Sequence, residues 1–326
     1  RYKLVTGVQT CALPISSCTD SDQRNRFHAP RGLAELATLR QAMPEARLLA
    51  GSTDIGLWVN KQFKALGDII YLGNVAELQA IIETAAQGKH PALLDIGAAV
   101  TLEVAWQTLA TRMPALREIW LRFASPPVRH AGTLVGNLAN GSPIGDSAPI
   151  LLALDATVVL RQGQTTRDMP LSAFYLDYMK NALQAGEFIQ SVRIPLIKPQ
   201  GAGVLRAYKI SKRRDSDISA VCAGLYIELD GERITAARLG WGGTAATARR
   251  ATHTEATLVG QDWTEATLRQ AQAALAQDFQ PMTDLRATRD YRIKVAANLL
   301  ERFWLETRPA NPLRPQDVQV WPCDAA

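Results

Sequence analysis

The spacing of apolar residues predicts alternating strands and helices along the first half of the chain. Leucines at helical spacing behind Pro30, a residue that the first turn of a helix accepts, predict an amphipathic helix. The same spacing predicts a second helix over 102–110. Short apolar runs predict buried strands over residues 47–51, 68–73 and 93–100. Strands and helices in alternation indicate an α/β arrangement of packed layers.

Between residues 124 and 160, glycine and proline recur at close intervals among valine, leucine and isoleucine. The interleaved apolar residues predict a loop with a function rather than a disordered linker. The block ends in an apolar run that predicts a strand, and residues 187–195 alternate as another strand. Proline and glycine over 196–203 predict a linker, so we place a domain boundary near residue 200.

The last third of the chain predicts strands first and helices afterwards, which indicates an α+β domain. Two apolar segments joined by Asp-Gly-Glu predict a β-hairpin. Amphipathic helices follow over 265–279 and 289–307. Val295, Leu299 and Phe303 form an apolar stripe on the second of these helices. Packing on its own sheet is the default for this stripe, and docking of a partner is the alternative.

Composition narrows the class of protein. A chain of 326 residues with 47% hydrophobic and 21% charged residues predicts two domains, each with its own core. The net charge is +5, but the basic residues are scattered, apart from the run 212–214, which argues against nucleic-acid binding. No apolar run reaches the roughly 18 residues of a membrane helix, so we expect a cytoplasmic protein without a membrane segment.

Metal-ligand patterns are absent from the sequence. The four cysteines include no Cys-x-x-Cys pair, and no two of the four histidines lie at helical spacing. We therefore expect no metal site. The segment Val5–Ile15 ("VTGVQTCALPI") resembles the translation of a sequencing adapter, so we treat residues 1–20 as a probable artefact and exclude them from fold reasoning.

The turn after the first predicted buried strand is a candidate anion site. Glycine lets the backbone approach a ligand, and consecutive amide groups over 51–54 form a nest to which the hydroxyls of Ser52 and Thr53 add donors. A pyrophosphate suits such a nest. Thr53 or Asp54 suits the N-cap of a following helix, and an ordinary capped turn is the favoured interpretation of this segment alone.

A second small-residue turn, over 132–137, shifts the interpretation of the first turn from an ordinary cap toward ligand binding. Two such turns can together bind one dinucleotide. Asp146 follows it and is a candidate acceptor for ribose or ribityl hydroxyls. The alternative role for Asp146 is the N-cap of a helix that begins at "SAPILLAL".

These stretches together resemble a known family. "LLAGSTDIG", "RHAGTLVGNLANGSPIGDSAP", "EFIQSVRIP" and "AYKISKRRDSDIS" are similar to the FAD-binding subunits of molybdenum hydroxylases, above all the small subunit of bacterial xanthine dehydrogenase. The resemblance implies an α+β fold. A two-subdomain FAD-binding domain of the molybdopterin dehydrogenase type is expected over 25–198. A domain like the C-terminal domain of CO dehydrogenase flavoproteins is expected over 203–308, with a tail over 309–326.

The resemblance also implies roles for individual residues, none of them catalytic. The loop Leu48–Ile55 would wrap the FAD diphosphate, and Thr133–Asn137 would add phosphate and ribityl contacts. Phe123 would lie near the isoalloxazine and Ile189 near the adenine. The implied FAD-binding residues are Leu48, Leu49, Ala50, Gly51, Ser52, Thr53, Asp54, Ile55, Phe123, Thr133, Gly136, Asn137, Asp146, Ile189 and Lys209.

The implied activity is electron relay. In the resembling enzymes a molybdopterin-bearing large subunit hydroxylates a purine, 2Fe-2S clusters carry the electrons to FAD, and the flavin reduces NAD. The clustered cysteines of an N-terminal 2Fe-2S domain are missing here, and we favour truncation over a naturally separate subunit. Open alternatives are a CO, nicotinate or aldehyde hydroxylase, oxygen as acceptor in place of NAD, and a flavin-less scaffold. Intact glycines at Gly51, Gly56, Gly132 and Gly136 argue against the scaffold.

Overall fold

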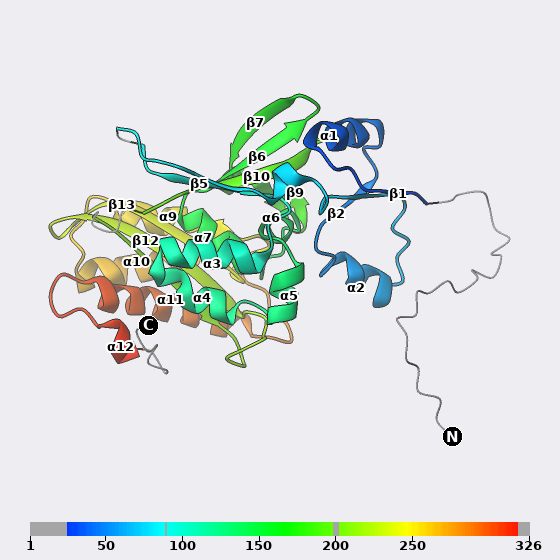
Figure 1. Cartoon of the computed structure of the whole chain (residues 1–326). Helices are drawn as coiled ribbons and strands as arrows, with labels where there is room; N and C mark the ends of the chain where they lie inside the picture. The colour runs from blue at the N-terminus through cyan, green and yellow to red at the C-terminus, as the bar shows by residue number, and fades with distance from the viewer. Residues whose placement is uncertain (1–24, 89, 198–201, 319–326) are drawn as a thin grey trace, which may run out of the picture.

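The computed structural model describes residues 25–88, 90–197 and 202–318 (Figure 1). Its first part contains a small parallel sheet of order β1-β3-β2. The strands are β1 (Phe27–His28), β2 (Arg47–Leu49) and β3 (Ile69–Tyr71), with helices α1 (Leu33–Ala42) and α2 (Ile55–Asn60) in the connections. The predicted alternation of strand and helix is confirmed here, because neighbouring parallel strands need such crossovers.

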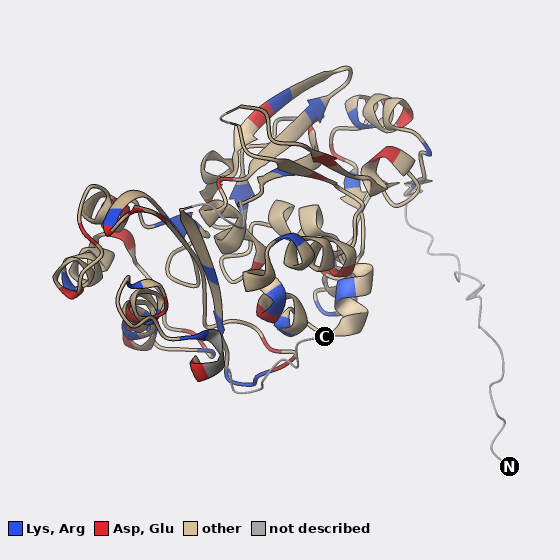
Figure 2. Ribbon diagram, turned by 60° about the vertical axis from the view of Figure 1, so that its left-hand side comes forward, with Lys and Arg blue, Asp and Glu red and all other residues tan. Residues whose placement is uncertain are grey.

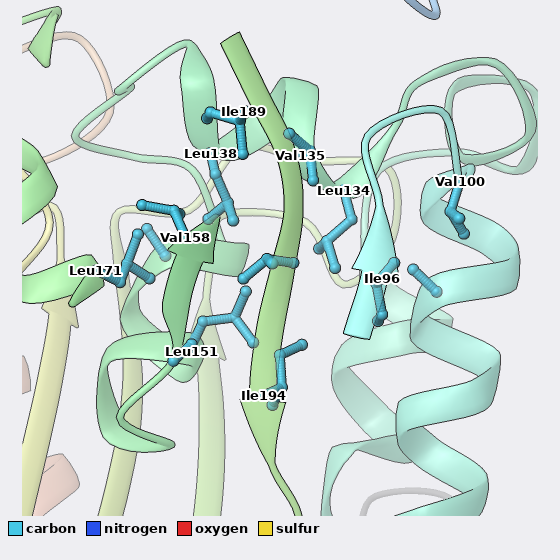
Figure 3. Close-up of a cluster of buried hydrophobic side chains, with 14 of the residues drawn as sticks. Ile96, Val100, Leu134, Val135, Leu138, Leu151, Val158, Leu171, Ile189 and Ile194 are labelled. Carbon is cyan, nitrogen blue, oxygen red and sulfur yellow. The ribbon is translucent and has the colours of Figure 1, made fainter. Parts of the chain in front are cut away.

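A five-stranded antiparallel sheet of order β4-β5-β10-β6-β7 follows. Its strands are β4 (Ile81–Thr84), β5 (Leu93–Gly97), β6 (Thr157–Gln162), β7 (Thr165–Pro170) and β10 (Phe188–Pro195). Side chains of this sheet and of nearby helices form one buried cluster, which includes Ile96, Val158 and Ile194 (Figure 3). Helix α3 (Leu102–Arg112) packs into the same cluster and begins at the N-cap Thr101.

The prediction of a long loop over 124–160 is wrong. The block contains three helices, α5 (Pro126–Ala131), α6 (Leu134–Ala139) and α7 (Ser147–Ala153). The 3-10 turn η2 (Pro114–Leu116) and helix α4 (Arg117–Arg122) precede it. Pro126 and Pro127 lie in the first turn of α5 and Pro149 in the first turn of α7, where no amide donor is needed, and Thr133 caps α6. The predicted second turn is therefore a helix N-terminus.

The second part begins with a four-stranded antiparallel sheet of order β11-β12-β13-β14. Strands β12 (Val221–Asp230) and β13 (Arg233–Gly242) form the predicted hairpin, flanked by β11 (Gly203–Ile210) and β14 (Arg249–Arg250). Helices α9 (Thr252–Leu258), α10 (Glu265–Asp278) and α11 (Arg289–Thr307) follow, and Leu299 and Phe303 of α11 are buried in the core that this part forms. The stripe on α11 thus packs on its own domain, as the default interpretation held.

Helix α7 joins the two parts, because its apolar side chains belong to the core of the first part while its backbone lies against β12 and β13 of the second. An added Cβ at Gly240 would lie 2.0 Å from the carbonyl oxygen of Pro149, and one at Gly224 would lie 2.6 Å from the Cα of Ile150. Glycines of β12 and β13 therefore allow the backbone of α7 to pack directly against the sheet. Figure 2 shows this sheet between helices of the first part and those of the second.

The remaining described elements are small. They are the 3-10 turn η1 (Ala76–Gln79), α8 (Leu171–Phe174), the two-stranded hairpin β8 (Tyr175–Asp177) and β9 (Lys180–Asn181), and α12 (Pro315–Val318). The excluded segment 1–20 and residues 198–201 of the predicted linker lie outside the described residues. Lys and Arg residues, blue in Figure 2, are spread over both parts. Of the helices described, none is long and apolar enough to span a bilayer.

Candidate functional site

A cavity of about 750 Å³ lies where the small parallel sheet, the helices after α3 and the second part of the chain meet. Its size is typical of pockets that hold a cofactor. Ile218, from the loop before β12, lines it from the side of the second part. Most of the residues predicted to bind FAD line this cavity: Leu48, Ala50, Gly51, Ser52, Thr53, Asp54, Ile55, Phe123, Thr133, Gly136, Asn137 and Ile189.

The turn after β2 presents unpaired donors to the cavity. Among the described residues, the amides of Gly51, Ser52, Thr53 and Asp54 donate no hydrogen bond, and the hydroxyls of Ser52 and Thr53 have no partner either. Ser52 has the positive φ of 61° that curls such a run of amides into a nest. Asp54 holds the N-cap position of α2 without a side-chain cap bond. The turn is therefore built to receive an anion.

Gly51 brings the two predicted turns into contact. A Cβ at this position would lie 1.8 Å from the carbonyl oxygen of Ala131 and 2.6 Å from the Cα of Gly132. Only glycine allows the backbones to approach so closely. The turn after β2 and the segment that leads into α6 thus form one continuous wall.

The N-terminus of α6 forms the next section of the wall. The hydroxyl of Thr133 accepts a hydrogen bond from the amide of Gly136 at 3.0 Å, as an N-cap does. The side-chain oxygen of Asn137 is buried and has no hydrogen-bond partner among the described residues. A buried polar atom without a partner in a cavity wall indicates a ligand that supplies one.

The opposite side of the cavity is apolar and strained. Phe123, 5% exposed, packs against Trp106 with ring centroids 5.8 Å apart, and Ile189 is 4% exposed. Ala124 and Met179, which also line the cavity, have φ of 47° and 53°. Left-handed backbone at residues other than glycine is costly and concentrates at ligand-binding segments.

Three predicted residues do not line the cavity: Leu49, Asp146 and Lys209. Asp146 and Lys209 are 6% and 3% exposed and form an ion pair, with Lys209 Nζ 2.5 Å from Asp146 Oδ2. Ser219 donates to the other carboxylate oxygen at 2.5 Å and accepts from Lys209 at 3.0 Å. Asp146 also stands at the N-cap position of α7, without a side-chain cap bond. This buried cluster links α7 to β11, next to the cavity.

Sequence reasoning missed several lining residues. Trp58, Ala124 and Met179 carry no motif, and only the fold brings them to the cavity. Ile218 comes from the second part of the chain, a distant contact that no local pattern encodes. Ala98 and Leu102 flank the end of β5 and the start of α3, where a glycine-bearing strand end next to a helix start was the available indication.

Comparison with known proteins identifies the family. Residues 22–197 match the FAD binding domain in molybdopterin dehydrogenase, and residues 206–307 match the CO dehydrogenase flavoprotein C-terminal domain. The chain belongs to this family of FAD-binding flavoproteins. The α+β fold predicted from the resemblance, a two-subdomain FAD-binding domain followed by a CO dehydrogenase flavoprotein C-terminal domain, is confirmed.

Individual relatives of this flavoprotein differ in length. A xanthine dehydrogenase of Emericella nidulans is 30% identical over 311 residues, which cover 91% of this chain but only 22% of that protein. The carbon monoxide dehydrogenase medium chain of Hydrogenophaga pseudoflava is 28% identical over 283 residues, 86% of this chain and 95% of that one. A solved carbon monoxide dehydrogenase from the same organism has a TM-score of 0.77 at 25% identity, covering 86% and 95% of the two chains.

The cavity residues fit FAD. The amide nest over 51–54 suits its diphosphate, the unpartnered oxygen of Asn137 suits a hydroxyl donor, and the wall around Phe123 suits an aromatic ring system. In contrast, the described residues contain no group of three or more His, Cys, Asp or Glu side chains that is arranged to hold a metal ion.

Proposed function

We propose that this flavoprotein is the FAD subunit of a xanthine dehydrogenase-like molybdenum hydroxylase, in which it takes electrons from iron–sulfur clusters and delivers them to NAD. The observation that carries the proposal is the combination, in one cavity, of an unpaired amide nest and a strained apolar wall. These two features suit a ligand that carries both a phosphate group and an aromatic ring system. The family match over 22–197 supports FAD as that ligand.

Individual residues would hold the cofactor in distinct ways. Leu48–Ile55 would bind the diphosphate through backbone amides, and Thr133, Gly136 and Asn137 would contact the phosphate and ribityl groups. Phe123 and Ile189 would pack against the ring systems. Asp146 and Lys209 bond to each other and do not line the cavity. We propose that they contribute to FAD binding indirectly, by supporting the cavity wall from behind.

When bound, FAD supplies the redox chemistry, since it accepts electrons singly and releases them as hydride. The contribution of the protein is then to bind the cofactor, exclude water from it and leave one side open to NAD. No described side chain has to act as an acid or a base. The predicted absence of catalytic side chains therefore stays part of the proposal.

The proposed partners are a molybdopterin-bearing large subunit and a 2Fe-2S domain or subunit. They are suggested by the relatives, in which a chain segment like this one is part of a larger xanthine dehydrogenase. A second candidate function is that of the medium chain of a carbon monoxide dehydrogenase. The observation in its favour is the structural likeness to a solved carbon monoxide dehydrogenase, which has a TM-score of 0.77 over 86% of this chain.

A titration of the apoprotein with FAD, followed by anaerobic NADH, tests the proposal. We expect stoichiometric FAD uptake and loss of the flavin absorption on adding NADH. Flavin that binds but does not respond to NADH would reject NAD as the partner and favour the carbon monoxide dehydrogenase type or an oxygen-using relative. A chain that takes up no FAD would reject the proposal and favour the scaffold.

A further inference from the structure

The Phe123–Ala124 wall of the cavity is held by groups that lie outside the cavity. The wall follows α4 directly, and Ala124 has a φ of 47°. A non-glycine residue keeps such a conformation only where its surroundings impose it. Backbone hydrogen bonds tie the segment 123–125 to α4 through the Phe123 amide and to α5 through the Ser125 carbonyl, so a constraint on the Phe123 carbonyl has to come from a side chain.

Arg129, on α5, supplies it. Its Nη1 donates to the carbonyl oxygen of Phe123 at 2.9 Å, and its Nε donates to Glu103 Oε2 at 2.5 Å. The other oxygen of Glu103 accepts from the indole nitrogen of Trp120, on α4, at 3.0 Å. One network thus connects α3, α4 and α5 and fixes the segment from both ends.

The network is partly shielded from solvent, because Arg129 is buried and its partners Glu103 and Trp120 are half-buried. Arg129 is 7% exposed, and its guanidinium fork makes two directional bonds that an ammonium group cannot reproduce. Burial alone would raise the pKa of Glu103, but the hydrogen bonds from Arg129 and Trp120 together with the nearby positive charges outweigh it, so that the pKa lies below its ordinary value. Glu103 therefore stays a carboxylate and keeps Arg129 in place.

We propose that Arg129, oriented by Glu103, is a positioning residue of the FAD site: it sets the place of the Phe123 ring without lining the cavity itself. This inference rests on the proposed function. Arg129 acts through the Phe123 carbonyl, so its loss would move the wall and change both the affinity for flavin and the environment of the ring. A purely structural ion pair would change stability alone.

The test compares Arg129→Met with a matched control, Arg250→Met. Arg250 also pairs with a glutamate, Glu255 at 2.6 Å, and also donates to a backbone carbonyl, that of Ala237 at 3.4 Å. None of these control residues lines the cavity. We expect Arg129→Met to raise the Kd for FAD about tenfold or more and to shift the absorption band of the bound flavin, because small displacements of a binding wall are costly. Arg250→Met should lower the Tm and leave both flavin properties unchanged.

A second measurement needs no flavin. Hydrogen exchange of the apoprotein should be faster over residues 120–132 in Arg129→Met and unchanged there in Arg250→Met. Unchanged exchange, or an unchanged Kd and flavin spectrum, would overturn the inference, as would an equal loss of FAD affinity in the control. A wild-type chain that takes up no FAD would instead refute the proposed function, and the exchange measurement would still decide whether Arg129 holds the segment.

Discussion

Replacing Gly51 by alanine should separate the turn after β2 from the segment that leads into α6, the two parts of the proposed FAD site that touch at this glycine. The new Cβ would lie 1.8 Å from the carbonyl oxygen of Ala131. Ordinary carbon–oxygen contacts begin at about 3.3 Å, so the turn after β2 and the start of α6 must move apart by about 1.5 Å. Overpacking of this kind costs about 1–3 kcal/mol. If this free energy is lost from FAD binding, the Kd for FAD rises roughly five- to 150-fold.

Gly56→Ala is the matched control for this prediction. A Cβ at Gly56 would meet only the Ser52 hydroxyl, at 3.4 Å, and Gly56 lies within α2, where alanine is favoured by about 1 kcal/mol. The structure therefore does not require glycine here, unlike at Gly51. FAD titration monitored by flavin fluorescence should show weak binding for Gly51→Ala and ordinary binding for Gly56→Ala. Equal affinities for the two variants would refute the reasoning.

Further predictions concern the groups around the cavity and in the second domain. Lys209→Met leaves the Asp146 carboxylate buried without its partner and should lower the free energy of unfolding by about 3–5 kcal/mol in urea titrations; a loss below about 1 kcal/mol would contradict a buried pair. Burial would raise the pKa of Asp278, but hydrogen bonds from Thr254 and His253 hold it below the ordinary value of 3.8. The unfolded chain then binds more protons, so this contribution to stability is present above pH 3.8 and is lost as the pH falls below it. Asp278→Asn should make the Tm fall less steeply as the pH is lowered below about 3.8. An unchanged pH dependence of the Tm would contradict the lowered pKa of Asp278. Burial raises the pKa of the Cys222 thiol, so alkylation at this residue, mapped by mass spectrometry, should occur only after unfolding.

Periodicity predicted the elements well where local pattern and environment agree. The hairpin of β12 and β13 and the helices α10 and α11 match the predicted ranges closely, because their apolar faces pack on one core. The block over 124–160 was misjudged, because prolines and glycines in short helices look like those in loops. Of the three helices, only α7 was anticipated, as the helix that Asp146 would cap, and its burial against the glycines of β12 and β13 stabilises it.

For the candidate site, the turn-forming residues were easier to predict than the apolar wall. Gly51 and Thr133 carry local backbone demands, namely a close approach and an N-cap, which a sequence records. Trp58, Met179 and Ile218 reach the cavity through long-range folding and leave no local pattern. Asp146 was predicted to be either a ligand contact or a helix cap. Its ion pair with Lys209 depends on a strand that follows more than sixty residues later.

The most direct test of the account is the visible absorption spectrum of the purified chain after incubation with FAD and removal of the unbound cofactor. We expect flavin bands at one FAD per chain, weakened in Gly51→Ala and kept in Gly56→Ala. A folded chain that stays colourless, with a cooperative thermal transition to show that it is folded, would contradict the claim that this cavity binds FAD.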